Sequence, residues 1–314
     1  MISMQETFIF GVDIGGTYIK FGRFDADRVL LEQWKIKTPQ KNEIELIYFI
    51  ADQIRKNLKK NRITEDQLMG IGIGVPGSVS EDGIVIHAPN IGWKMTDIRK
   101  IWNRYCKIPV FVANDANAAA LGEYHNGSGR GYHSMVLITL GTGVGAGVIQ
   151  GGRIMTGAHG GAGELGHMPV DVDESEPCTC GKRGCLEQYA SANGIVNVFK
   201  RILQHSDVPS KLRSLLDTIS AKDIFEAEQC GDKAAAAAAE NFGRAMGQAL
   251  ACTAAVIDPE VFVIGGGMSK AGGILLDYIS KYYKQYAFTP SKDAGLVLAS
   301  LGNEAGIYGA ARLV

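Results

Sequence analysis

The first third of the chain alternates short apolar runs with a segment in which apolar residues recur at helical spacing. Residues 7–14 form an apolar, β-rich run that ends at the pair Gly15-Gly16, and the strand pattern resumes over 18–24. Residues 42–60 carry apolar side chains at intervals of three and four, with lysines near the end, as an amphipathic helix does. These patterns predict a β-hairpin followed by a helix.

The alternation of strand and helix continues beyond this point. Residues 69–75 read as a buried strand broken by Pro76-Gly77, and 110–113 as another strand that leads into a helix over 116–124. Alternation of this kind is typical of an α/β sheet with reactive groups at the ends of its strands. We therefore expect the α/β class.

The hairpin pattern then repeats. The segment SMVLITLGTGVGAGVIQ at 134–150 matches FIFGVDIGGTYIKFGRF at 8–24, which predicts two lobes built alike. We place a small α/β lobe over 1–114 and a larger α/β lobe over 115–302, with a helix over about 303–314 packing back on the first. In the second lobe we expect a strand at 261–264 and helices at 194–204, 221–228 and 233–257, the last rich in alanine.

Charge and hydropathy limit the possible partners. The 314 residues include 32 basic and 33 acidic side chains, so no basic field exists for a nucleic acid or an anionic membrane. No apolar run is long enough to cross a bilayer, and the start MISMQETFIF lacks the features of a signal peptide. We expect a cytoplasmic protein that acts on small molecules.

One short segment contains a histidine and three cysteines at the spacing of a metal site. His167 precedes Cys178, Cys180 and Cys185, and a His/Cys3 set suits a closed tetrahedral zinc site of the structural kind. The alternatives are reduced thiols or a disulfide, but a Cys-x-Cys bridge has poor geometry. The metal would also fix the nearby carboxylates Glu164 and Glu187, which can bind hydroxyl groups.

Three strands end in glycine-rich turns that could hold phosphates. They are Asp13 to Thr17 (DIGGT), Leu140 to Gly143 (LGTG) and Gly265 to Gly267 (GGG). Glycine lets main-chain amides approach phosphate oxygens. Each turn alone could be an ordinary tight turn, but the three together favour nucleotide binding, and none is a Walker-type loop.

Two aspartates at strand ends are candidates for chemistry. Asp13 could bind magnesium beside the phosphates, or its carboxylate could accept hydrogen bonds from the amides of the following turn. Asp115 could cap the following helix, with Asn114 sharing that role, or it could take the proton during phosphoryl transfer to a hydroxyl.

The order of these motifs resembles the ROK family of sugar kinases and regulators. The resemblance covers nearly the whole chain and includes DIGGT, Pro76-Gly77, APNIGW at 88–93, NDANAAALGE at 114–123, GELGH at 163–167 and CTCGKRGCLE at 178–187. It implies a two-lobed actin-like (ribonuclease H-like) ATPase fold, with the active-site cleft between the lobes and a structural zinc site. Bacterial ATP-dependent glucokinases are the most similar members.

The resemblance also implies a role for each motif residue. Asp115 would be the general base, and the sugar would be bound by Asn90, Asn114, Glu164, His167 and Glu187. The phosphates and Mg2+ of ATP would lie among Asp13, Gly15, Gly16, Thr17, Gly141 and Thr142, and the nucleoside would face Gly265, Gly266 and Gly267. Many glucokinases of the family have lysine where this chain has Tyr18, and whether Lys20 replaces it stays open.

Taken together, the sequence predicts transfer of a phosphoryl group from ATP to the 6-hydroxyl of glucose, in a homodimer. A kinase for another hexose or for an N-acetylhexosamine shares the same motifs. A sugar-sensing regulator of the family is the alternative from another class, but only about a dozen residues precede Asp13, and we expect no helix-turn-helix there.

Overall fold

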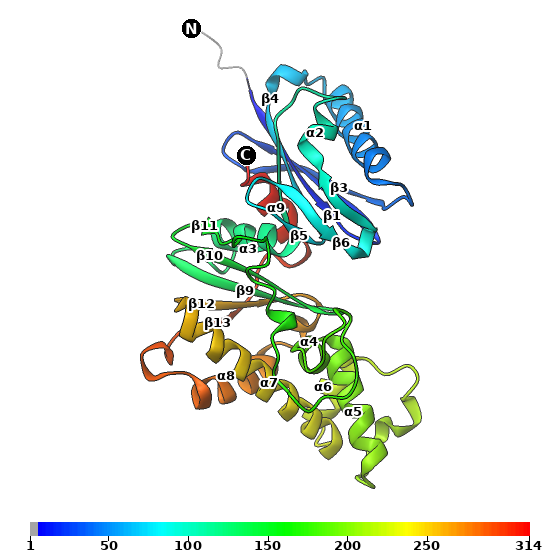
Figure 1. Cartoon of the computed structure of the whole chain (residues 1–314), viewed down its shortest axis with the longest axis vertical. Helices are drawn as coiled ribbons and strands as arrows, with labels where there is room; N and C mark the ends of the chain where they lie inside the picture. The colour runs from blue at the N-terminus through cyan, green and yellow to red at the C-terminus, as the bar shows by residue number, and fades with distance from the viewer. Residues whose placement is uncertain (1–5) are drawn as a thin grey trace. The chain divides into compact units, whose positions relative to one another are not determined.

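The computed structural model describes residues 6–314, which form two compact units (Figure 1). Unit 1 contains the described residues up to Gly131, then Gly147–Gly163 and Leu301–Val314. Unit 2 contains Tyr132–Ala146 and Glu164–Ser300. The helix that begins at Asp115 therefore belongs to unit 1, whereas the sequence placed the start of the second lobe at that residue.

Unit 1 is built on a five-stranded sheet of order β3-β2-β1-β4-β8. Its strands are β1 (Phe8–Ile14), β2 (Tyr18–Asp25), β3 (Leu30–Lys37), β4 (Leu68–Val75) and β8 (Val110–Asn114). β1 pairs antiparallel with β2 and parallel with β4, and β4 pairs parallel with β8. The predicted hairpin and the two later strands are confirmed, whereas β3 was not predicted.

A second sheet has the order β11-β10-β9-β12-β13, which repeats the strand order of the first sheet. Its strands are β9 (Ser134–Leu140), β10 (Val144–Gln150), β11 (Arg153–Ile154), β12 (Val261–Gly265) and β13 (Gly295–Leu298). β12 is parallel to both β9 and β13. The repeated hairpin pattern in the sequence therefore marks a repeated sheet.

The helices of unit 2 are α4 (Glu187–Ala190), α5 (Ala192–His205), α6 (Ala221–Gln229), α7 (Lys233–Ile257) and α8 (Gly273–Tyr286). The three predicted helices are confirmed as α5, α6 and α7 within two residues at each end, whereas α4 and α8 were not predicted. The alanine-rich α7 starts after Asp232, whose carboxylate accepts hydrogen bonds from the amides of Ala234 and Ala235. Its apolar face packs against α5, α6 and α8.

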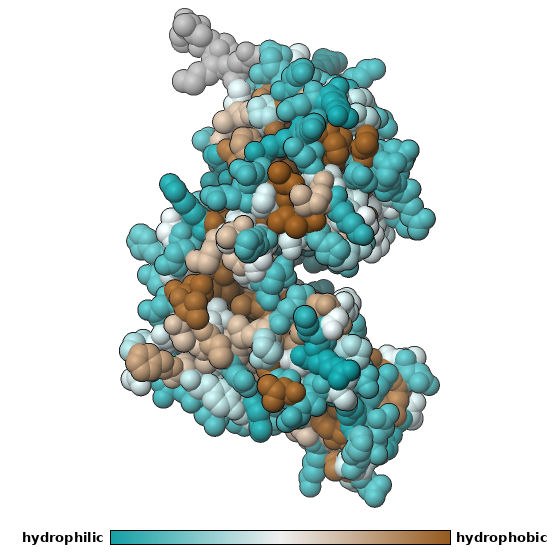
Figure 2. All heavy atoms as spheres, in the orientation of Figure 1, coloured by the Kyte–Doolittle hydropathy of each residue, from teal (hydrophilic) through white to brown (hydrophobic). Residues whose placement is uncertain are grey.

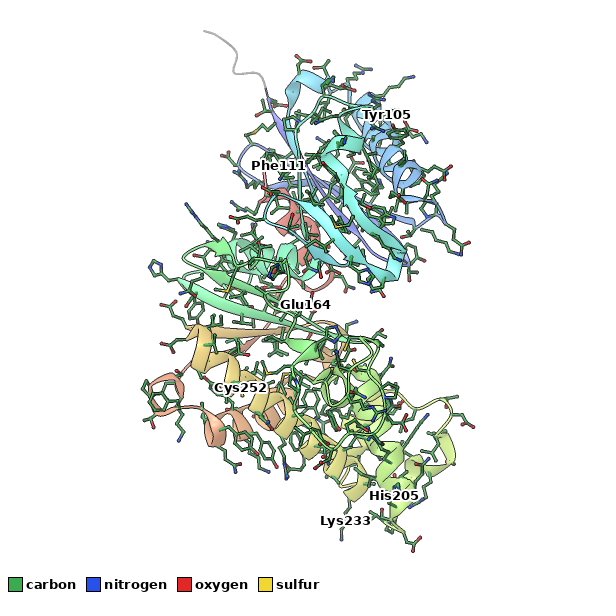
Figure 3. All side chains as sticks on the ribbon, in the orientation of Figure 1. Tyr105, Phe111, Glu164, His205, Lys233 and Cys252 are labelled. Atoms are coloured by element: carbon green, nitrogen blue, oxygen red, sulfur yellow. The ribbon has the colours of Figure 1, made fainter. Side chains whose placement is uncertain are left out.

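Unit 1 has further elements around its sheet. Helix α1 (Glu43–Asn61) begins after Asn42, whose side chain accepts a hydrogen bond from the Glu45 amide at 2.9 Å. In the sequence, the segment between β4 and β8 forms a small sheet of order β5-β6-β7 and a short helix. These elements are β5 (Ser78–Val79), β6 (Ile84–Ala88), β7 (Trp93–Asp97) and α2 (Ile98–Trp102). Near the end of α1, Arg55 lies over the ring of Tyr105, which is labelled in Figure 3.

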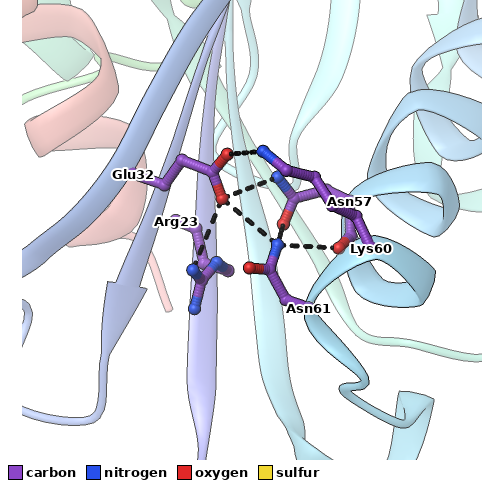
Figure 4. Close-up of polar contacts among 5 residues, drawn as sticks. All are labelled: Arg23, Glu32, Asn57, Lys60 and Asn61. Carbon is purple, nitrogen blue, oxygen red and sulfur yellow. Dashed lines mark hydrogen bonds and ion pairs between the residues drawn. The ribbon is translucent and has the colours of Figure 1, made fainter.

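A half-buried carboxylate joins α1 to the sheet of unit 1 (Figure 4). Glu32 on β3 accepts hydrogen bonds from Lys60 at 2.7 Å, from Asn57 at 3.1 Å and from Asn61 at 3.2 Å, and Arg23 lies 3.4 Å away. The hydrogen bond from Lys60 has the largest effect, and with the two amides it lowers the Glu32 pKa from 4.5 to about 2 although burial opposes the shift.

The C-terminal segment returns to the first sheet. Helix α9 (Ala305–Ala311) packs on β1, β4 and α3 (Asp115–Asn126), and Figure 1 shows it in red beside β1. The approach is close because glycines face it: a Cβ on Gly72 would lie 1.7 Å from the Ala310 carbonyl oxygen. The sequence predicted a helix over about 303–314 at this place.

Large apolar side chains fill the space between the sheets and their helices, and the face seen in Figure 2 is mostly hydrophilic with separate hydrophobic patches. Within residues 6–314, no helix is both long enough and apolar enough to span a bilayer.

Candidate functional site

The four predicted metal ligands come together in unit 2. One ligand atom from each of His167, Cys178, Cys180 and Cys185 lies within 4.8 Å of the others, although the residues span nineteen positions of sequence. The Sγ atoms of Cys180 and Cys185 are 3.6 Å apart, and Nδ1 of His167 is 3.8 Å from Sγ of Cys178. All the cysteines of the chain are free thiols, so the disulfide alternative is wrong.

These separations match the requirements of a tetrahedral zinc ion. With Zn–S near 2.3 Å and Zn–N near 2.0 Å, tetrahedral angles place neighbouring donors about 3.5–3.8 Å apart. Burial raises the Cys185 pKa to about 12, together with hydrogen bonds to the neighbouring thiols Cys180 and Cys178 and the repulsion between thiolates so close together. A bound cation would remove that repulsion, so the donor set fits zinc in both geometry and charge.

Glu187 lies against this cluster from the first turn of α4. Its Oε1 accepts hydrogen bonds from Thr179 Oγ1 at 2.7 Å and from Cys178 Sγ at 3.0 Å, and it lies 3.9 Å from His167 Nδ1. The same carboxylate faces the turn after β9, since a Cβ on Gly143 would lie 2.7 Å from Glu187 Oε2. Nδ1 of His167 thus faces the cluster, which leaves Nε2 for another partner.

Glu164 lies one short turn before His167, and its carbonyl accepts a hydrogen bond from the His167 amide at 3.1 Å. Its side chain is labelled in Figure 3. Although the residue is exposed, nearby protein atoms partly desolvate its carboxylate and raise its pKa. Repulsion from Glu187 acts in the same direction, whereas His167 opposes it. Glu164, His167 and Glu187 therefore form one electrostatic group.

A cavity of about 580 Å³ lies in unit 2 between the glycine turns and α6. Two of the predicted nucleotide residues, Gly141 and Gly267, line it, whereas Thr142, Gly265 and Gly266 are not among its lining residues. Its other walls come from the start of α5, from α6 and from the turn after Gly267; they include Ala192, Ala221, Lys222, Phe225, Glu226, Gln229, Met268 and Lys270. The α6 residues of this cavity carry no sequence signal beyond their helical periodicity.

Asp13 in unit 1 is paired with a lysine. Its Oδ2 accepts a hydrogen bond from Lys20 Nζ at 2.9 Å, and the same ammonium donates to the Asn303 carbonyl at 3.0 Å. The carboxylate also touches α9, because a Cβ on Gly306 would lie 2.8 Å from its Cγ. Lys20 thus brings a positive charge to the predicted phosphate turn, on the strand that carries Tyr18 where many relatives have lysine.

Asn114 and Asp115 lie where β8 passes into α3. The helix cap is Asn114, whose Oδ1 accepts a hydrogen bond from the Asn117 amide at 3.0 Å and whose Nδ2 donates to the Gly77 carbonyl at 2.9 Å. Asp115 is the first helical residue, with Oδ1 2.8 Å from the Ala116 amide. The helix therefore has its cap without Asp115. Asn90 is exposed in the short helix Pro89–Ile91 of the same unit.

The structure thus brings the metal ligands together with Glu164 and Glu187 in unit 2, and it brings Asp13 together with Lys20 in unit 1. Gly15, Gly16 and Thr17 form the turn between β1 and β2, in which the Gly15 amide donates to the Tyr18 carbonyl at 3.0 Å. The assignment of the nucleotide and sugar residues to their ligands stays a prediction.

Known proteins with similar sequences and structures are sugar kinases and sugar regulators. The chain is 40% identical to a glucokinase of Halalkalibacterium halodurans, over 99% of this chain and 96% of the relative. It superposes on the crystal structure of a ROK family glucokinase from Streptomyces griseus, solved with glucose and AMPPNP, with a TM-score of 0.78, 35% identity and coverage of 98% and 99% of the two chains. A xylose repressor of Caldicellulosiruptor bescii is 32% identical over 89% of this chain and 71% of its own length. The ROK family model matches residues 9–314, and the chain therefore belongs to the ROK family.

Proposed function

We propose that the protein is an ATP-dependent glucokinase, which transfers the γ-phosphoryl group of ATP to the 6-hydroxyl of glucose. The observation that carries the proposal is the group of Glu164, His167 and Glu187 beside the four-donor cluster, in a chain similar over its full length to glucokinases. Hydroxyl groups need fixed acceptors and donors, and this group supplies both.

The nucleotide is assigned to the cavity of unit 2. The cavity is large enough for a nucleoside, and its walls include Phe225 and Met268, which suit an apolar base. Gly141 and Gly267 line it at the ends of β9 and β12, where main-chain amides can approach phosphates. Mg2+ enters with ATP as part of the substrate, and Asp13 is its proposed carboxylate partner.

The cluster of His167, Cys178, Cys180 and Cys185 is proposed to hold structural Zn2+. With all four positions filled by protein, the ion would supply no activated water, and its contribution is to shape the loop. Its binding through Nδ1 of His167 would fix the tautomer with the proton on Nε2, which can then donate to a sugar hydroxyl. Glu164 and Glu187 accept hydroxyl hydrogens in this proposal, and Asn90 and Asn114 are the other proposed sugar-binding residues.

Asp115 is the proposed general base. It removes the proton of the attacking hydroxyl as the oxygen bonds to the γ-phosphorus and the bond from that phosphorus to ADP breaks. The proton is then on Asp115, the phosphoryl group is on the sugar, and ADP leaves. Its position supports this role, because a carboxylate at the carboxyl end of a strand is placed as reacting groups are in α/β proteins. Asn114 already caps α3, so capping does not explain Asp115.

The repeated strand order supports the finer assignment of an actin-like, ribonuclease H-like ATPase fold with one such sheet in each lobe. The predicted lobes 1–114 and 115–302, the homodimer and the cytoplasmic location stay proposals. The regulator is the second candidate, favoured by the similarity to a xylose repressor, which this chain matches over 71% of that protein's length.

An assay of ADP release decides between these functions. The protein is tested with MgATP and a panel of glucose, other hexoses and N-acetylhexosamines, and we expect turnover with glucose. Turnover only with an acetylated sugar would assign another kinase of the family. Sugar binding without ATP turnover would establish the regulator instead.

A further inference from the structure

Glu187 lies in a helix that is too short to be stable without contacts to the rest of the fold. Helix α4 comprises only Glu187–Ala190, and a single turn of helix has no intrinsic stability in water. Cys178 and Thr179 donate hydrogen bonds to the Glu187 carboxylate, and these contacts fix only the outer end of the side chain. The position of the Glu187 main chain, from which the side chain starts, must therefore depend on what else holds α4.

Tyr189 supplies that anchor from the same helix. Its hydroxyl lies 2.7 Å from Oε2 of Glu174 and 2.8 Å from Oδ2 of Asp171, and the guanidinium of Arg201 lies 5.8 Å from its ring centre. Arg201, on α5, also donates to Glu174 at 2.8 Å. One carboxylate thus joins α4, α5 and the loop between His167 and Cys178.

Glu174 is an unusual residue for a surface loop. Its side chain is only 2% exposed, and it also accepts a hydrogen bond from the Glu176 amide at 3.0 Å. Burial alone would raise the Glu174 pKa, but the bonds from Arg201, Tyr189 and this amide lower it to about 2. A buried, ionised group with three donors fixes the middle of a loop whose two ends are at the metal ligands.

We propose that Tyr189, held by Glu174 and Asp171, is a positioning residue that orients Glu187 toward the sugar. The inference rests on the proposed function for the role of Glu187. The contacts among Tyr189, Glu174 and Arg201, which we call the clamp, all lie within unit 2 and do not depend on that function. Zinc bound to the four donors would hold the ends of the loop 168–177, and the clamp of Tyr189, Glu174 and Arg201 holds its middle against α4 and α5. Both attachments are needed to fix His167 and Glu187 together.

The test is Tyr189→Phe, which removes one hydroxyl and keeps the ring. We expect the KM for glucose to rise about tenfold, equivalent to about 1.4 kcal/mol, while the KM for ATP changes less than about twofold, because Tyr189 does not line the nucleotide cavity. A merely structural loss would lower kcat and affect both substrates alike. Unchanged glucose KM, or an equal rise for glucose and ATP, would overturn the proposal.

Tyr282→Phe is the matched control. Tyr282 donates to Glu240 at 2.6 Å and lies beneath Lys281, so it has the same tyrosine, carboxylate and cation arrangement on α7 and α8. We expect its glucose KM to equal that of the wild type. Should Tyr189→Phe fail to fold, Glu174→Gln replaces it, because it keeps the shape of the clamp. We expect the same selective rise in the KM for glucose, and an unchanged KM for glucose in this variant would refute the proposal.

A second measurement is independent of catalysis. The wild type, Tyr189→Phe and Tyr282→Phe are each loaded with zinc, and metal transfer to the chelator 4-(2-pyridylazo)resorcinol is followed by absorbance. We expect release to be about tenfold faster from Tyr189→Phe than from the wild type or Tyr282→Phe, because the loop between His167 and Cys178 has lost an anchor. If the wild type phosphorylates no sugar, the proposed function fails, and this release rate still tests the clamp. Equal release rates would overturn it.

Discussion

The substitution Gly309→Ala separates local helix propensity from packing, because the two predict opposite signs. Gly309 lies in α9, and alanine in a helix is favoured over glycine by about 1 kcal/mol. In the structure, however, a Cβ on Gly309 would lie 1.5 Å from the carbonyl oxygen of Ala118 and 2.8 Å from the amide nitrogen of Gly122, both on α3. Backbone atoms cannot rotate out of the way as a flexible side chain would.

The magnitude follows from this overlap. Ordinary carbon to oxygen contacts are about 3.3 Å or longer, so α9 and α3 would have to separate by nearly 2 Å. Overpacking of a core commonly costs about 1–3 kcal/mol, and separation of two helices that both pack on β4 and β8 belongs at the upper end. After the gain in helix propensity, we expect a net loss of about 2 kcal/mol and a melting temperature lower by about 4–8 °C.

The assay is thermal unfolding followed by far-ultraviolet circular dichroism, with Gly273→Ala as the control. Gly273 is also in a helix, at the start of α8, but nothing lies within 4 Å of its Cβ position and its φ is not in the left-handed region. We expect this control to melt at or above the wild-type temperature. If Gly309→Ala is as stable as Gly273→Ala, the close packing of α9 on α3 is wrong.

Three further predictions concern the proposed base, the metal cluster and the Glu32 cluster. Asp115→Asn should lose at least about 10²-fold in turnover while glucose binding by calorimetry persists, and normal turnover would remove Asp115 from its role. Cys180→Ser should bind less zinc by elemental analysis and have a higher glucose KM; a metal-free variant with normal KM would exclude the cluster from sugar binding. Because the Glu32 pKa is lowered from 4.5 to about 2, the carboxylate stabilises the fold fully above pH 4.5 and loses that contribution as the pH falls toward 2. Urea unfolding should therefore show Glu32→Gln to be less stable than the wild type by about 1–2 kcal/mol at pH 7, a value limited by the exposure of Lys60, and equally stable near pH 2; a constant difference would contradict the assignment.

The sequence predicted the elements whose signal is local. Helix α7 has the predicted bounds, because alanine and regularly spaced apolar residues act within a few turns. Strand β3 alternates half-buried and exposed positions along its whole length, a local pattern that indicates a strand although none is predicted there above. Strands β5 and β6 are different: β5 has two residues, and its pairing depends on a partner further along the chain.

The residues of the candidate site also differ in whether a local sequence pattern predicts them. The spacing of one histidine and three cysteines predicted four ligands because metal sites constrain residue type strongly. The clamp on Tyr189 had no comparable signal, since glutamate, tyrosine and arginine occur on any surface and only the fold brings Glu174 to Arg201. The α6 residues that line the cavity could not be predicted for the same reason, because Phe225 has the pattern of an ordinary core residue in the sequence.

The position of Glu187 explains one glycine of the predicted phosphate turn in a way that phosphate binding alone does not. The space that a side chain at Gly143 would occupy is taken by Glu187 Oε2. The carboxylate is held on its other side by Thr179 of the metal loop, and the Gly141 carbonyl of the same turn accepts a hydrogen bond from the Ala192 amide at the start of α5. The turn, the metal loop and the helices after it therefore form one packed unit. A side chain at position 143 would displace the Glu187 carboxylate, which accounts for the glycine at that position.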